Sequence, residues 1–122
     1  MMWSTKNRIA LINADLKPTL LQHINENSLK KGFHIDFQNC VKDHIHVLLN
    51  LHPDQKLSEI IQLIKGESSY WINHNNLLKT KFEWQDEYIA VSVSESIVNK
   101  VRDYIKNQEE HHKKLTFMDE YN

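Results

Sequence analysis

The chain has 122 residues, of which 40% are hydrophobic and 25% charged, and this composition indicates one globular domain and excludes a disordered chain. Its net charge of -1 favours no particular partner and opposes a large nucleic-acid interface, and its two glycines are too few for a phosphate-binding glycine loop. A single cysteine, no long apolar run and no signal-peptide core together predict a cytoplasmic protein without internal disulfides.

Hydrophobic periodicity and turn residues divide the chain into short elements. Pro18 suits the first turn of a helix, and Gly32 stands where the C-cap of that helix is expected. The expected elements are a strand over 3–7, a helix from Asp15 or Leu16 to Lys31, a strand over 33–38, a turn over 39–43, a strand over 43–51, a helix over 56–73, a strand over 88–93 and a helix over about 94–113. This order predicts an α+β sandwich of the ferredoxin-like type, with helices on one face of an antiparallel sheet.

The strand over 43–51 carries two histidines where apolar residues are usual. Its apolar residues alternate and share one face, so His44 and His46 share the other face. Residues two apart in a strand stand about 6.6 Å apart along the chain, so both rings can converge on one ion. Two polar residues on a half-solvated face are the simpler reading, but the apolar surroundings favour a site because a buried imidazole needs partners.

The register of the predicted hairpin decides whether a third group joins these histidines. If the hairpin is centred near Lys42, Gln38 and Cys40 face the same side as His44 and His46, and a slip of one residue removes them. Cys40 is then a candidate third ligand, although a small buried residue is the favoured interpretation.

The second half of the helix over 56–73 mixes a base, hydroxyls and aromatic rings. Such a mixture, from Lys65 to Trp71, suits contacts with phosphates and bases. Core packing of the aromatic residues remains the favoured reading from composition alone.

The last helix, with Ser92 or Ser94 as its N-cap, has one narrow stripe that combines apolar and polar residues. Tyr104 and Gln108 lie four apart on this stripe, so both would look into the core or a site. From the pattern alone, a core tyrosine bonded to its neighbour is the favoured alternative. The apolar members of the stripe are Ile97, Val101 and Ile105.

Four segments, spread over almost the whole chain, carry a family resemblance. They are WSTKNR at Trp3–Arg8, DHIHVLL at Asp43–Leu49, IQLIKGESSYWIN at Ile61–Asn73 and SVSESIVNKVRDYIKNQEEHHKKLTFMDEY at Ser92–Tyr121. Together they resemble the single-tyrosine HUH transposases of the insertion-sequence 200/605 family and the related REP-associated tyrosine transposases. The His-hydrophobe-His pair alone is a weak motif. It becomes specific when the helical segments at Ile61–Asn73 and Ser92–Tyr121 follow it in this order.

The resemblance implies an HUH endonuclease fold in one domain over 1–122, with the tyrosine helix at about 94–113 and a short tail over 114–122. It implies a metal-dependent transposase that cleaves and rejoins single-stranded DNA through a 5′-phosphotyrosine intermediate and recognises hairpins at element ends. The expected partners are hairpin-bearing single-stranded DNA and a second copy of the chain. In several family members the tyrosine helix of this homodimer serves the histidines of the other subunit.

Carried over by motif, Tyr104 is the nucleophile, and His44, His46 and Gln108 hold a divalent metal ion, Mg²⁺ or Mn²⁺. Two alternatives are a decayed or domesticated protein that binds hairpin DNA without cutting it, and a zinc-dependent hydrolase. The intact set of four residues opposes the first alternative, and the lack of a third histidine opposes the second. Weaker candidates for DNA contact are Lys65, Ser68, Ser69, Trp71, Lys6 and Arg8.

Overall fold

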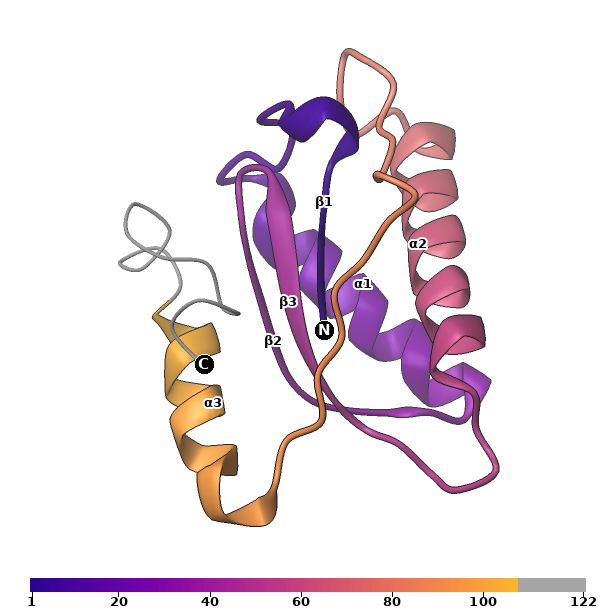
Figure 1. The fold of residues 1–122 in the computed structure, drawn as a ribbon. Helices are drawn as coiled ribbons and strands as arrows, with labels where there is room; N and C mark the ends of the chain where they lie inside the picture. Colours follow the sequence, from indigo (N-terminus) through magenta and orange to yellow (C-terminus); the bar gives the residue numbers. More distant parts are fainter. Residues whose placement is uncertain (108–122) are drawn as a thin grey trace.

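A computed structural model of the chain describes residues 1–107, in which three α-helices pack on a three-stranded antiparallel sheet (Figure 1). The elements are β1 (Met2–Ser4), the 3-10 helix η1 (Lys6–Arg8), α1 (Leu16–Lys31), β2 (His34–Val41), β3 (His44–Asn50), α2 (Leu57–His74), the 3-10 helix η2 (Glu95–Ile97) and α3 (Val98–Lys106). The sheet order is β1-β3-β2, so the histidine strand is central. The α+β class and the antiparallel sheet are thus confirmed.

Helix α1 has the bounds that its sequence predicts. Its inward residues Leu16, Leu20 and Ile24 recur every four positions and are buried. Gly32 follows the helix with a φ of 80°, and its N–H donates to the carbonyl oxygen of Ser28. This left-handed C-cap is the conformation that glycine adopts without steric cost.

The sheet has a helix layer on each face. On one face, Ile45 and Val47 of β3 pack in the main core with α1 and α2. On the other face, Phe37 of β2 packs against Val101 and Ile105 of α3. Figure 1 shows α3 on the side of the sheet away from α1 and α2. The expectation that the helices share one face is therefore wrong for α3, whose two buried residues stand four apart and form a stripe of their own.

The tight turn of the β2–β3 hairpin is formed by residues 42–43. Its register therefore differs by one residue from that of the predicted hairpin, which was centred on Lys42. Cys40 pairs with Ile45, and Gln38 pairs with Val47. These two residues therefore lie on the α1 and α2 face, and the fully buried Cys40 belongs to the main core. The placement of Cys40 beside the histidines is wrong, because a one-residue slip moves every side chain to the other face.

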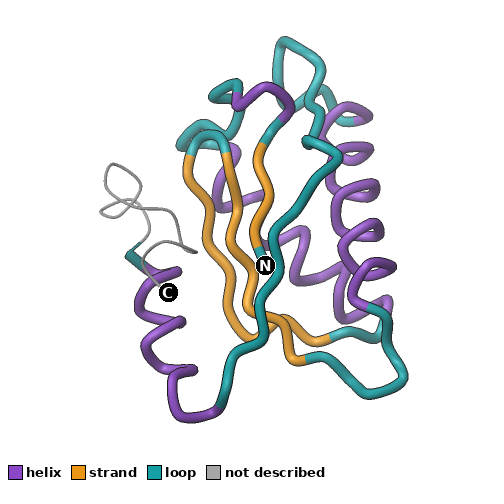
Figure 2. Tube along the Cα trace, in the orientation of Figure 1, coloured by secondary structure: helices purple, strands orange, loops and turns teal. Residues whose placement is uncertain are grey.

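The predicted strand over 88–93 is not formed, although this segment runs beside β1 (Figure 2). Among the described residues, one isolated bridge, between Met2 and Ile89, joins β1 to this segment, and a second bridge joins Thr5, just after β1, to Trp84, which precedes the segment. Between the two bridges the N-terminal chain advances three residues (5 − 2) and the opposite chain five (89 − 84). The two extra residues interrupt the ladder, as in a bulge.

The first strand is also shorter than predicted. Thr5 Oγ1 donates to the carbonyl oxygen of Ile9 at 2.7 Å, which closes a turn directly after β1. Asn7 and Arg8 within this turn have φ values of 58° and 54°. The chain therefore leaves the sheet at η1.

The last helix begins later than predicted, since η2 precedes α3 and Ser94 is the N-cap residue of η2. Residues 108–113 of the predicted helix and the predicted tail over 114–122 lie outside the described residues. Within residues 1–107, no helix combines the length and the apolar character that crossing a membrane requires.

Candidate functional site

The candidate site is built on β3, on the sheet face that α3 covers. His44 and His46 are both buried, and their ring centroids lie 5.3 Å apart with the planes at 84°. Strand β1 pairs with this part of β3 on one side and strand β2 on the other. A central strand therefore holds both imidazoles, which point the same way as the period of two requires.

The neighbouring residue Asp43 contacts the first histidine directly. Asp43 Oδ1 lies 2.7 Å from His44 Nδ1, and Asp43 Oδ2 lies 3.6 Å from Arg8 Nε. The carboxylate thus stands between an imidazole of the candidate site and a cation of the η1 turn.

Helix α3 brings a tyrosine to the histidine pair. The ring centroids of Tyr104 and His46 lie 5.6 Å apart, and the two ring planes meet edge-on at 71°. Tyr104 also packs beside Val101 and Ile105, which bury the helix against the sheet. The structure therefore brings together Tyr104, His44 and His46, and Gln108 lies outside the described residues.

An ion pair joins α3 to strand β2. Arg102 Nε and Nη2 each lie 2.7 Å from an oxygen of Asp36. The hydrogen bonds from Arg102 lower the pKa of Asp36, and the same contact raises the pKa of Arg102. A bidentate pair of this kind fixes direction as well as distance.

The far end of α3 is held by an amide. Asn39 Nδ2 donates to the carbonyl oxygens of Ile105 and Lys106 at 3.0 and 3.1 Å. Neither Asn39 nor the ion pair was predicted from the sequence, because their roles depend on the strand register and on the face that α3 covers. The sequence did contain a signal, the polar residues of β2. These residues indicate contacts with α3 only when the register shows which of them face that helix.

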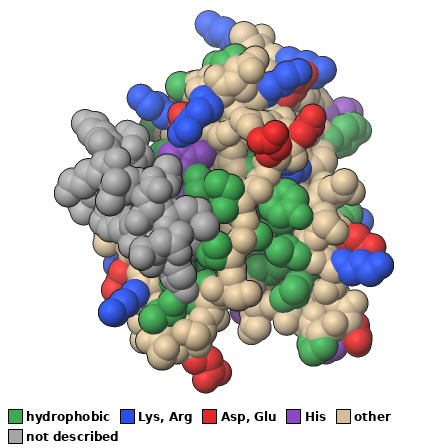
Figure 3. Space-filling view, viewed as in Figure 1, with side chains coloured by type: hydrophobic (Ala, Val, Ile, Leu, Met, Phe, Trp, Pro, Cys, Tyr) green, Lys and Arg blue, Asp and Glu red, His purple; other side chains and the backbone are tan. Residues whose placement is uncertain are grey.

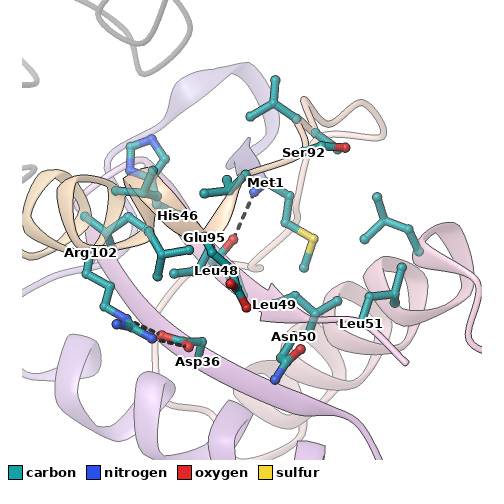
Figure 4. A pocket seen from close by; sticks show the side chains of 18 of the residues that line it. Met1, Asp36, His46, Leu48, Leu49, Asn50, Leu51, Ser92, Glu95 and Arg102 are labelled. Carbon is teal, nitrogen blue, oxygen red and sulfur yellow. Dashed lines mark hydrogen bonds and ion pairs between the residues drawn. The ribbon is translucent and has the colours of Figure 1, made fainter. Parts of the chain in front are cut away.

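A pocket of about 770 Å³ opens between α3, the segment over 90–95 and the part of β3 that carries His46 and Leu48 (Figure 4). His46 lies on its wall, and the Asp36–Arg102 pair lies on the same wall farther along. Leu48, Val91 and other apolar side chains form much of the remaining lining. The candidate site therefore adjoins a space large enough for a small ligand group.

The donor set of the described residues fits part of a metal site. His44 and His46 offer two imidazole nitrogens, which suit first-row divalent ions. Within residues 1–107, no group of three or more His, Cys, Asp or Glu side chains gathers as a metal site would require. Among the described residues, the histidine pair is therefore the set of candidate ligands at this place.

Two of the predicted DNA contacts in α2 face the protein interior. Ser68 is fully buried, and its hydroxyl accepts a hydrogen bond from Trp84 Nε1 at 2.8 Å. Trp71 stacks on His23 of α1, with ring centroids 3.9 Å apart. In this arrangement both side chains hold neighbouring segments together.

The other predicted contacts are more accessible. Lys65 Nζ donates to the carbonyl oxygen of Asp86 at 2.9 Å, and burial lowers the pKa of Lys65. Ser69 bonds within α2. Lys6 and Arg8 of η1 expose 60% and 63% of their side chains. Figure 3 shows Lys and Arg side chains near a histidine on one face of the molecule. The 3.6 Å distance from Arg8 Nε to Asp43, which contacts His44, places a cation beside the candidate site.

The sequence matches a family model over most of its length. The model described as "Transposase IS200 like" covers residues 1–108. The ISDra2 transposase TnpA of Deinococcus radiodurans is 21% identical over 113 residues, which are 88% of this chain and 81% of that protein. The transposase for insertion sequence element IS200 of Salmonella typhimurium is 34% identical over 79 residues, which are 61% of this chain and 51% of that protein. The match thus spans about half the length of the Salmonella relative.

Two solved structures share the fold. A crystal structure from Deinococcus radiodurans R1, described as that of a transposase, has a TM-score of 0.70 at 22% identity and covers 88% of this chain and 86% of that one. A REP-associated tyrosine transposase bound to a REP hairpin has a TM-score of 0.64 at 19% identity, over 91% of this chain and 65% of that one. At these identities the likeness establishes the arrangement of the elements.

Proposed function

The chain belongs to the family of IS200-like transposases, and we propose that it is a metal-dependent transposase that cleaves and rejoins single-stranded DNA through a 5′-phosphotyrosine intermediate. The observation that carries the proposal is the placement of Tyr104 beside the histidine pair. The ring centroids of Tyr104 and His46 lie 5.6 Å apart, and those of His46 and His44 lie 5.3 Å apart. Hairpin-bearing DNA is the proposed substrate, because one structural relative is described with a bound REP hairpin.

In this proposal Tyr104 Oη forms a bond to the scissile phosphorus, and the bond between phosphorus and the 3′ oxygen breaks. The phenol gives up its proton, and the departing 3′ oxygen takes up a proton and leaves as a hydroxyl. An unperturbed phenol has a pKa of about 10 and leaves more readily than an alkoxide. An incoming 3′-hydroxyl can therefore reverse the reaction and join strands without ATP.

The proposed metal ligands are His44, His46 and Gln108, with Mg²⁺ or Mn²⁺ as the ion. When bound, the ion supplies Lewis-acid stabilisation of charge on the phosphate oxygens. Gln108 follows Tyr104 by four residues, the spacing of neighbours on one helix face. The docking of one helix would then position both the nucleophile and a ligand. Lys6 and Arg8 are proposed to contact the DNA backbone near this site.

The direct test is a covalent adduct. Wild-type protein incubated with Mn²⁺ and a hairpin-bearing single strand is expected to give a species that survives SDS. Tyr104→Phe should abolish this species, whereas the matched control Tyr88→Phe, at a tyrosine 40% exposed outside the site, should retain it. An adduct from Tyr104→Phe would refute the assignment of the nucleophile. Hairpin binding that EDTA leaves unchanged, without any adduct from wild type, would identify a DNA-binding relative instead.

The proposed assembly is a homodimer, and the contact between Tyr104 and His46 in one chain supports a site completed within each subunit. A mixing experiment separates the two arrangements. Tyr104→Phe and His46→Ala chains are each expected to lack activity, and their mixture should remain inactive if each site uses one chain. An adduct in the mixture would show that the tyrosine acts across the dimer.

A further inference from the structure

We propose that Asp43 is a positioning residue that holds the His44 ring in one tautomer, with the proton on Nδ1, so that Nε2 serves as the donor atom for a divalent cation. This inference rests on the metal-dependent function proposed above. Its starting point is the 2.7 Å contact between Asp43 Oδ1 and His44 Nδ1. A carboxylate accepts and cannot donate, so this contact requires the proton on Nδ1.

Contacts with Thr5 and Arg8 hold both the backbone and the side chain of Asp43. Its carbonyl oxygen accepts a hydrogen bond from the backbone N–H of Thr5 at 2.8 Å, and the same oxygen lies 3.3 Å from Thr5 Oγ1. Its second carboxylate oxygen lies 3.6 Å from Arg8 Nε. Asp43 also sits in the two-residue turn that leads directly into β3. The carboxylate therefore approaches His44 from a fixed direction.

The local burial strengthens this contact. The side chain of His44 is 8% exposed and that of Asp43 is 21% exposed, so water competes weakly for the hydrogen bond. A carboxylate on one ring nitrogen fixes the orientation of the ring and raises the basicity of the other nitrogen. Because a neutral imidazole carries one proton, a proton on Nδ1 leaves the lone pair on Nε2.

The chain supplies a matched control for this pair. His52 and Asp54 also place a carboxylate beside a histidine Nδ1, but at 3.7 Å and with side chains 67% and 91% exposed. Asp54→Asn therefore makes the same chemical change as Asp43→Asn, outside the candidate site.

The first test reads the tautomer without metal or DNA. In ¹⁵N NMR spectra of metal-free protein at a pH where His44 is neutral, wild type is expected to show the proton on Nδ1. Asp43→Asn should populate the form with the proton on Nε2, whereas Asp54→Asn should leave the His44 signals unchanged. A proton on Nε2 in wild type, or an unchanged His44 in Asp43→Asn, would overturn the proposal.

The second test measures Mn²⁺ affinity by electron paramagnetic resonance. Asp43→Asn is expected to weaken Mn²⁺ binding by about 10- to 100-fold, with Asp54→Asn equal to wild type. Urea unfolding of each variant confirms that the chain remains folded. Equal affinity in Asp43→Asn and wild type, or no Mn²⁺ binding by wild type, would overturn the proposal. Neither test needs DNA, so failure to form the tyrosine adduct would refute the proposed reaction and leave this inference standing.

Discussion

Arg102 on α3 and Asp36 on β2 form a bidentate ion pair in which Nε and Nη2 each lie 2.7 Å from a carboxylate oxygen (Figure 4). The pair ties the helix that carries Tyr104 to the strand next to β3. The position of the proposed nucleophile therefore depends on a charged contact that lies on the wall of the pocket.

This pair predicts how stability responds to acid. The hydrogen bonds from Arg102 lower the pKa of Asp36 below its ordinary value of 3.8. Because the folded-state pKa is the lower one, the contribution to stability is fully present above the unfolded-state value and is lost as the pH falls through the folded-state value. The urea midpoint of wild type should exceed that of Asp36→Asn by a constant amount above about pH 5, and the difference should vanish in strong acid. A difference that persists there would contradict the role of the charge.

Asn39 should influence the reaction more than a comparable amide elsewhere. Its side chain bonds to the last carbonyl groups of α3, close to Tyr104. Asn39→Ala should lower the free energy of unfolding by about 1 kcal/mol, the usual net value of such bonds, and should also slow adduct formation. Asn75→Ala is the control, since Asn75 Nδ2 bonds to the carbonyl oxygen of Trp71 at the end of α2. Equal adduct rates in the two variants would contradict a positioning role for Asn39.

Cys40 tests the register of the hairpin. The structure places Cys40 in the main core opposite Ile45, away from the histidines. Cys40→Ala should therefore lower the free energy of unfolding by about 1 kcal/mol, the scale for removing one buried heavy atom, and should leave Mn²⁺ affinity unchanged. A tenfold loss of affinity, measured by the same resonance titration, would place the thiol on the other face.

These contacts explain which features the sequence could predict. Helix α1 was predicted with its bounds because Gly32 and the Leu16, Leu20, Ile24 stripe are local signals. The prediction that His44 and His46 share one face of the strand followed from the strand period of two. Local signals did not indicate that the hairpin turns at residues 42–43. The sequence therefore did not determine the strand register, and the register decides which face of the sheet Cys40 occupies.

The same limit applies to the last third of the chain. The strand over 88–93 has a suitable composition, but the two extra residues before Ile89 interrupt its pairing with β1. The contacts that hold α3 on its side of the sheet include Asp36 and Asn39, which lie far from α3 in the sequence. Such long-range contacts become visible only when the strands are in register.

Ser68 is expected to act on stability and to leave DNA affinity unchanged. Its buried hydroxyl accepts the indole N–H of Trp84, so Ser68→Ala leaves that donor without its acceptor and should lower the free energy of unfolding by about 1–3 kcal/mol. Ser69→Ala is the control for stability, because the Ser69 hydroxyl bonds to Gly66 at the surface of α2. Urea unfolding and hairpin binding by fluorescence anisotropy separate the two effects. Loss of DNA affinity in folded Ser68→Ala would show that Ser68 reaches the DNA.

Lys6 should contribute to DNA affinity through charge alone. Its side chain is 60% exposed in η1, beyond the histidine end of the sheet, and its ammonium lies 3.2 Å from Glu83. If Lys6 neutralises one phosphate of a single strand, Lys6→Ala should reduce the slope of log K against log salt by about 0.7, through the loss of one counterion release. Lys30→Ala, at an exposed position near the end of α1, provides a control of equal charge. Anisotropy titrations of one hairpin at several salt concentrations measure both slopes. Equal slopes for the two variants would mean that Lys6 does not contact the DNA backbone, and Arg8 would then be the cation of the η1 turn left to test in the same way.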